Sequence, residues 1–237
     1  MKVCIHQPNY LPWLGFFKKI ALSDIYVVFD DVQYPTGKDF HNRNQIKTNN
    51  GKMWLTVPVI GKSQLVNFHS IGLNNKEWKD IRFKHTNNIK NFYSKSKYFN
   101  DIYPTLSSFY GFFNNGAPQF NTLMELNIEI IKYLFFELEI KTKIFYSSSI
   151  CKDQPQLKGL DKIIYILKEL KATEYVTSNG PGASRYIDKD KFTENNIKLN
   201  MFDYKHPIYN QLHGDFIPNL SIIDLLFNEG PNSKNIL

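Results

Sequence analysis

The sequence predicts a doubly wound α/β fold with a mostly parallel sheet. Short apolar strands alternate with amphipathic helices near both ends of the chain. The run IYVVF (25–29) is apolar on both faces, as buried parallel strands are. Strand, loop, helix and strand also follow one another within about thirty residues, the length of a βαβ unit. Right-handed crossovers then place helices on both faces of the sheet.

The first βαβ unit begins with the strand KVCIH (2–6) and the loop that follows it. A helix is expected over 13–22, because apolar residues recur there at helical spacing with Lys18 and Lys19 on the other side. The strand 25–29 comes next and ends in two aspartates, Asp30 and Asp31.

The middle of the chain has a different pattern. A polar stretch that includes HNRNQIK (41–47) precedes two strand-like segments, 54–60 and 65–73, which we expect at a sheet edge or in an insertion. Three segments are largely helical: 76–93, 98–113 and 118–139, with Pro118 suited to a first helical turn. Residues 75–140 are therefore predicted to be a helical insertion or subdomain of one domain, 1–237.

Strand and helix alternation resumes toward the end of the chain. The predicted strands are 142–149, 174–178 and 197–204, and the predicted helices are 157–170, a helix from about 183, and 220–230. Gly230 and Pro231 end the last helix, as such residues commonly do.

Composition narrows the class of protein. The chain has 237 residues, of which 42% are hydrophobic and 15% aromatic, so it is expected to build a substantial core. The longest apolar runs are too short to span a bilayer, and no secretory leader is evident. Cys4 and Cys151 give neither a disulfide framework nor a metal-ligand spacing. A cytoplasmic protein without a membrane span is the expectation.

The net charge of +7 comes from widely spread lysines. A nucleic-acid partner is disfavoured, because its footprint would cluster Lys and Arg on one face. We interpret the positive charge as that of a solvated surface, which would also suit a phosphorylated substrate.

Polar residues follow the predicted parallel strands, where such sheets bind ligands. His6 ends the first strand, Asp30 and Asp31 follow the second, and Ser178 ends the strand 174–178. These residues should therefore meet at one edge of the sheet.

The loop after the first strand, IHQPNYLPWLG, carries His6, Gln7, Asn9 and Tyr10 between stiffening prolines. We expect these four residues to face a ligand. The alternative is that they hydrogen-bond the loop backbone, or in the case of Tyr10 lie in the core.

Asp30 or Asp31 is expected to accept a hydrogen bond from a sugar hydroxyl or an amine. Capping of the next turn and metal binding are the alternatives. In the polar stretch, Asn42, Arg43 and Asn44 are candidate ligand contacts. Arg43 suits a carboxylate or a phosphate.

The turn SNGPGASR can cradle an anion at a helix N-terminus, and the alternative is a plain tight turn. Its candidate binding residues are Ser178, Asn179, Gly180, Gly182 and Arg185.

Residues 206–218 read as a lid or binding loop with His206, Tyr209 and Gln211 as candidates. Their spacing is not that of a zinc site, and no nucleophile elbow is present, so no metal ligands are assigned.

Several motifs together resemble the WbqC-like family over essentially the full length: HQPNYLPWLGFFKKI, DIYVVFDDVQY, RNQIKT with WLTVPV, TSNGPGASRYID, and YNQ with FIPNLSIIDLLFNEGP. Such proteins are found in bacterial gene clusters for surface polysaccharide (O-antigen, part of lipopolysaccharide). The resemblance implies transfer of glycine or another aminoacyl group to an amino sugar.

The opening also resembles nucleotidylyltransferases and class I synthetase-like domains, which implies a Rossmann-like fold. Pro12 and Gly15 fit their HIGH-type motif, but Phe16 stands where that motif has its second His. ATP-dependent adenylyl transfer is thereby put in doubt.

The leading hypothesis is an acyl- or aminoacyltransferase that acts on a nucleotide-linked amino sugar. Histidine has an ordinary pKa close to neutrality, so His6 is the expected base, with Gln7 and Asp31 as further catalytic residues. His6, Asn9, Asp31, Arg43 and Arg185 should line one cleft. The alternatives are an adenylyl or nucleotidyl transferase and a non-catalytic nucleotide-sugar-binding module.

The cofactor stays open. ATP is a candidate cofactor, and charged tRNA is a further candidate for the acyl or aminoacyl donor.

Overall fold

The computed structural model describes residues 1–35, 37, 39–61, 66–111, 120–180 and 187–237. The chain forms two compact units. The first unit comprises Met1–Gln7, Gly15–Val32 and Lys141–Lys205; the second comprises Pro8–Leu14, Gln33–Ile140 and His206–Leu237. The single domain expected from the sequence stays a prediction.

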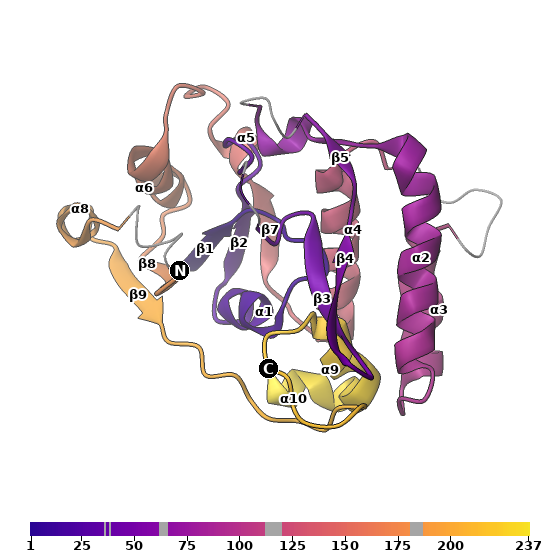
Figure 1. Cartoon of the computed structure of the whole chain (residues 1–237). Helices are drawn as coiled ribbons and strands as arrows, with labels where there is room; N and C mark the ends of the chain where they lie inside the picture. Colours follow the sequence, from indigo (N-terminus) through magenta and orange to yellow (C-terminus); the bar gives the residue numbers. More distant parts are fainter. Residues whose placement is uncertain (36, 38, 62–65, 112–119, 181–186) are drawn as a thin grey trace. The chain divides into compact units, whose positions relative to one another are not determined.

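The first unit is built on a parallel sheet (Figure 1). Its strands are β1 (Lys2–His6), β2 (Ile25–Val28), β7 (Lys143–Tyr146), β8 (Glu174–Ser178) and β9 (Lys198–Phe202). They pair in the order β7-β2-β1-β8-β9, and every pair is parallel. The predicted α/β class and its five sheet members are confirmed.

Helices cover both faces of this sheet. Val3 and Ile5 of β1 face a core that α6 (Gly159–Glu169) and α8 (Lys189–Glu194) complete with Ile166 and Phe192. On the other face, Tyr26 of β2 lies edge-on to Phe16 of α1 (Leu14–Ala21), with ring centroids 5.8 Å apart. Residues that alternate along each strand thus serve two separate layers, the doubly wound arrangement.

The predicted strand 142–149 is wrong at its end, because Ser147 begins a helical turn, α5 (Ser147–Ile150). Serine side chains hydrogen-bond nearby groups and so favour helix starts over strands. Here Asp30 accepts a hydrogen bond from the backbone N–H of Ser148 at 2.9 Å, which fixes the start of the turn.

The second unit contains two small antiparallel pairs. β3 (Arg43–Thr48) pairs with β4 (Gly51–Thr56), and β5 (Val59–Ile60) pairs with β6 (Gly72–Leu73). The segment 54–60 is therefore two strands, and they flank Pro58, which has no N–H for a ladder. In the segment 65–73, the described residues form a 3₁₀ turn, η1 (Phe68–Ser70), and then β6.

The helical insertion consists of α2 (Asn75–Tyr93), α3 (Phe99–Ser108) and α4 (Leu123–Glu137). Helix α4 begins later than predicted, because Thr122 and Glu125 form a reciprocal capping box at its start. Pro118 lies outside the described residues. The chain closes with α9 (Ile222–Glu229), η2 (Gly230–Asn232) and α10 (Ser233–Ile236). Among the described helices, none has the length and apolar character to cross a membrane.

One lysine of α1 is buried against the sheet. Lys19 is 4% exposed, and burial lowers its pKa from 10.5 to about 8, partly opposed by the nearby Cys4. The unfolded chain therefore binds this proton more tightly than the folded protein does. The resulting cost to stability is fully present below pH 8 and is relieved as the pH rises toward 10.5.

Replacing Lys19 by Met should stabilise the protein at neutral pH by roughly 1–3 kcal/mol, because a buried ammonium becomes an apolar chain. In the native protein, the free energy of unfolding should rise between pH 8 and pH 10, and in Lys19→Met this rise should be smaller. Urea unfolding at several pH values measures both effects. Lys18→Met, on the same helix, is the control. If the free energy of unfolding rose equally between pH 8 and pH 10 in Lys19→Met and in Lys18→Met, the lowered pKa of Lys19 would be contradicted.

Candidate functional site

The parallel sheet brings the carboxyl ends of four strands to one edge of the first unit. His6 ends β1, Asp30 and Asp31 follow β2, Ser147 follows β7 and Ser178 ends β8. Because β7, β2, β1 and β8 are neighbours in that order, these residues follow one another along the edge. This edge is where doubly wound proteins bind ligands.

His6 is held in one tautomer. Its Nδ1 lies 2.7 Å from the backbone carbonyl oxygen of Gln7, and a carbonyl only accepts. Nδ1 therefore carries the proton, and Nε2 is the basic nitrogen of the neutral ring. The ring also lies edge-on to Phe16, with centroids 5.3 Å apart, which fixes its plane.

Asp30 is 3% exposed and is committed to the fold. Its Oδ1 accepts a hydrogen bond from the Ser148 N–H at 2.9 Å and lies 3.0 Å from the Ser147 hydroxyl oxygen, and its Oδ2 accepts from the Ser148 hydroxyl at 2.6 Å. The carboxylate thus caps α5, a helix far along the chain, and not the turn that follows β2.

Asp31 forms an ion pair with Lys162 of α6, with Oδ2 and Nζ 2.6 Å apart. The Lys162 side chain is only 2% exposed and that of Asp31 is 13% exposed. The other Asp31 oxygen accepts from the Ser147 hydroxyl. Two positioned partners leave the Asp31 carboxylate fixed at the edge of the sheet, where solvent or a ligand reaches part of it.

Sequence reasoning missed Lys162. The available signal was its place on the apolar side of α6, beside Ile163 and one turn before Ile166. A charged residue on the buried face of a helix is expected to have a partner.

The turn after β8 is only partly described. Ser178 and Gly180 are half-buried, and Asn179 is exposed. Gly182 and Arg185 lie outside the described residues, so the predicted anion cradle stays a prediction.

In the second unit, buried amides hold the opening loop 8–14. The Asn44 Nδ2 donates to the Leu11 carbonyl at 2.6 Å, and the Asn127 Nδ2 donates to the carbonyls of Pro8 and His41 at 3.1 and 2.8 Å. Leu11 has a φ of 43°, a left-handed conformation that non-glycine residues adopt only when surrounding contacts hold it. Asn44 therefore stabilises the loop.

Tyr10 is fully buried. Its hydroxyl lies 2.9 Å from His85 Nδ1 and 2.5 Å from the Tyr110 hydroxyl. Burial lowers the pKa of His85 to about 4, so this cluster is uncharged near neutral pH. Tyr10 packs and bonds as a core residue.

Asn9 has a different environment. It is 6% exposed, and its Oδ1 has no hydrogen-bond partner among the residues that the structure describes. A buried amide oxygen without a donor is costly, so this atom is a ready acceptor for an N–H or O–H group.

Asn42 and Arg43 have separate roles at the start of β3. The Asn42 Nδ2 donates to the Val57 carbonyl at 2.8 Å and is buried. Arg43 is half-buried; its Nε donates to the Asp39 carbonyl at 3.1 Å, and its guanidinium lies 4.3 Å from the centre of the Trp54 ring. The segment 41–47, expected as a polar stretch, is largely strand, and Asn42, Asn44, Ile46 and Lys47 in it are buried.

The predicted binding loop 206–218 takes part in a buried network. Asp224 accepts hydrogen bonds from Tyr93, Tyr209 and Gln211 at 2.8, 2.8 and 2.7 Å. The Gln211 Oε1 accepts from Lys47 Nζ at 3.0 Å. Burial raises the pKa of Asp224 and lowers that of Lys47. Tyr209 and Gln211 therefore anchor the loop to β3 and α9.

His206 stacks on Tyr209, with ring centroids 6.2 Å apart and planes at 28°. Unlike Tyr209, which is buried, His206 is half-exposed.

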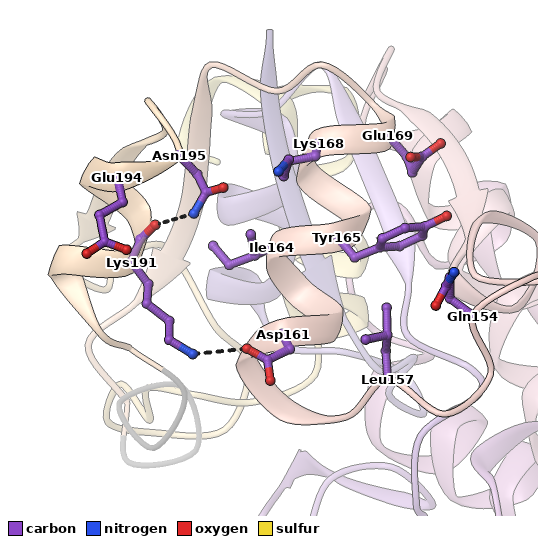
Figure 2. A pocket seen from close by; sticks show the side chains of 10 residues that line it. All are labelled: Gln154, Leu157, Asp161, Ile164, Tyr165, Lys168, Glu169, Lys191, Glu194 and Asn195. Carbon is purple, nitrogen blue, oxygen red and sulfur yellow. Dashed lines mark hydrogen bonds and ion pairs between the residues drawn. The ribbon is translucent and has the colours of Figure 1, made fainter.

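A surface groove of about 600 Å³ lies between α6 and α8 of the first unit (Figure 2). Asp161 and Lys191 form an ion pair across it at 3.0 Å, and Ile164 and Tyr165 contribute apolar surface. None of the predicted site residues lines this groove.

The fold and its polar edge define a doubly wound α/β protein with an oriented imidazole and a fixed carboxylate at the strand ends. Within the described ranges, no three His, Cys, Asp or Glu side chains group as metal ligands would.

The chain belongs to the WbqC-like protein family, whose model matches residues 7–236, as the motifs predicted. It is similar to the uncharacterized protein Rv1507c of Mycobacterium tuberculosis (strain ATCC 25618 / H37Rv), at 34% identity over 242 residues. The match covers 100% of this chain and 97% of the relative. No solved structure shows significant similarity to the chain.

Replacing Asn44 by Ala should destabilise the protein by about 1–3 kcal/mol, because the Leu11 carbonyl loses a buried donor. Urea unfolding measures the change. Asn210→Ala, at an exposed position of the same unit, should stay within about 0.5 kcal/mol of the native protein. Equal stability of the two variants would show that Asn44 does not hold the loop.

Proposed function

We propose that the protein is a transferase that N-acylates or aminoacylates a nucleotide-linked amino sugar, as a step in making surface polysaccharide. The observation that carries this proposal is the hydrogen bond between His6 Nδ1 and the Gln7 carbonyl. It makes Nε2 a base at the sheet edge where doubly wound proteins hold ligands. The chain belongs to the WbqC-like family, and the resemblance to that family implies the same substrate class.

In the proposed reaction, the sugar amine attacks the carbonyl carbon of the acyl donor. His6 Nε2 takes a proton from the nitrogen as the C–N bond forms, and the imidazolium then returns it to the leaving group as the bond from the acyl carbon to that group breaks. The Gln7 amide is proposed to donate to the oxyanion that develops between these steps. Acyl transfer of this kind is complete without an oxidant or a reductant.

Asp31 is proposed to orient the amine or a neighbouring sugar hydroxyl. Its ion pair with Lys162 supports this role, because a carboxylate held at both oxygens keeps its position when a ligand arrives. Asp30, which is buried and caps α5, is proposed to support Asp31 from the adjacent position.

The remaining candidates are proposed either to contact the substrate or to shape the site. The unpartnered Oδ1 of Asn9 is suited to accept from a sugar hydroxyl. Arg43 and Arg185 suit the phosphates, and Ser178, Asn179, Gly180 and Gly182 are proposed as a set of backbone donors. Asn42, Asn44, Tyr10, Tyr209 and Gln211 are proposed to shape the site through the buried contacts described above. His206 is proposed to contact the substrate directly.

Two His6 variants test the base. His6→Asn keeps a donor at the place of Nδ1 and removes Nε2, whereas His6→Gln keeps a non-basic nitrogen at the place of Nε2. Both should fold normally and lose activity by roughly ten- to ten-thousand-fold, the range that a general base supplies. His213→Gln is the matched control, because the His213 Nε2 also donates to a carbonyl, that of Phe92.

A thermal-shift screen with nucleotide amino sugars, ATP, acyl-CoA and magnesium selects the substrates. Mass spectrometry then follows acyl transfer to the selected sugar from acetyl-CoA, from glycyl-tRNA, or from glycine with ATP. An active His6→Asn protein would show that His6 is not the general base. Release of pyrophosphate from ATP without an acylated sugar would favour adenylyl transfer. Binding of nucleotide sugars without turnover under any donor would favour a binding module.

A further inference from the structure

The β3–β4 hairpin presents one face that differs from the rest of the second unit. Register places Arg43 opposite Thr56 and Gln45 opposite Trp54, so these four side chains share a face. Asn44, Ile46 and Leu55 lie on the other face and are buried. The shared face is therefore the outward one at this end of the hairpin.

Two large aromatic side chains are exposed there. Trp54 is 40% exposed and Phe40 is 43% exposed, and their ring centroids lie 5.8 Å apart at 40°. Paired exposed aromatics leave an apolar surface in water, which is the usual mark of a surface that binds something.

A cation adjoins the same aromatic pair. The Arg43 guanidinium lies 4.3 Å from the centre of the Trp54 ring, and its Nε is fixed on the Asp39 carbonyl at 3.1 Å. Among the described residues, the two Nη groups of Arg43 have no hydrogen-bond partner. They offer four N–H donors in a planar array, the geometry that binds phosphate oxygens.

We propose that Phe40, Trp54 and Arg43 form a platform for a nucleoside diphosphate, with the base stacked on the aromatic rings and the phosphates bound by Arg43. We call these three residues the stacking platform. The inference deepens the proposed function, since it names residues that would hold the nucleotide of the activated sugar. Binding of the nucleotide itself is measured without any transfer reaction.

The chemistry of the stacking platform favours a nucleotide over other ligands. An apolar partner would have to desolvate the Arg43 guanidinium without compensation. A free sugar can pack on an aromatic ring but gives Arg43 no anion. A nucleoside diphosphate uses both parts, because every base has a face for stacking and the diphosphate accepts charge-assisted hydrogen bonds. The exposed Lys52 on β4 and the net charge of +7 also favour an anion.

Isothermal titration calorimetry of the whole chain with UDP, ADP and GDP tests the stacking platform. At least one nucleotide should bind, and Trp54→Ala should weaken it by roughly 5- to 150-fold, the loss expected for one stacked base. Arg43→Gln should weaken the diphosphate more than the free nucleoside. Phe136→Ala removes an aromatic ring of the same unit that is 79% exposed, and should leave binding unchanged.

Circular dichroism melting shows whether each variant folds; if Trp54→Ala does not, Trp54→Leu, which keeps apolar bulk but has no ring for stacking, gives the same comparison together with Arg43→Gln. Nucleotide binding that is unchanged in both Trp54 and Arg43 variants would overturn the inference. So would glucosamine binding as tightly as UDP, independently of Arg43. Weakened UDP binding without any acyl transfer would support the platform while the proposed function fails. Acyl transfer that is unaffected by these variants would support the function and overturn the platform.

Discussion

The Asp30 carboxylate joins the end of β2 to the start of α5, and the first unit depends on this link. Its partners Ser147 and Ser148 lie more than a hundred positions further along the chain. Between them the chain leaves the first unit at Val32 and returns at Lys141. The pairing of β2 with β7 and the Asp31–Lys162 ion pair fix the same junction. A long insertion is tolerated because it connects two strands that pair directly, leaving after the carboxyl end of β2 and returning at the amino end of β7.

The parallel sheet could be predicted because its strands are short apolar runs whose character is local. β3 could not be predicted, because its sequence is mostly polar, with Arg43, Asn44, Gln45 and Lys47. Only the pairing with β4 shows which side of the strand is buried. The start of α4 is set by the capping box of Thr122 and Glu125. The sequence contains this motif, but Pro118 suggested an earlier start. The helical pattern places Lys162 on the apolar side of α6, but no local pattern identifies Asp31 as its partner.

The candidate site shows why residue type alone does not separate a scaffold from a ligand contact. Asn9 and Asn44 are both buried amides near the opening loop, yet Asn44 is bonded to Leu11 and the Asn9 Oδ1 has no partner among the described residues. The sequence predicted both as ligand contacts, because each is a planar donor in a polar segment. It gave no reason to select Trp54, whose exposure follows from its side of the hairpin.

The register of the sheet also bears on how the chain is made. β1 pairs with β8 through Lys2 and Glu174. One edge of β1 therefore has no β8 to pair with until most of the chain has been synthesised. The residues of the second unit's long segment, Gln33–Ile140, all leave the ribosome before that partner does. Until then β1 is an open strand edge, the kind of surface that pairs with other chains. A ribosome that stops short of β8 would release a chain with its central strand unprotected.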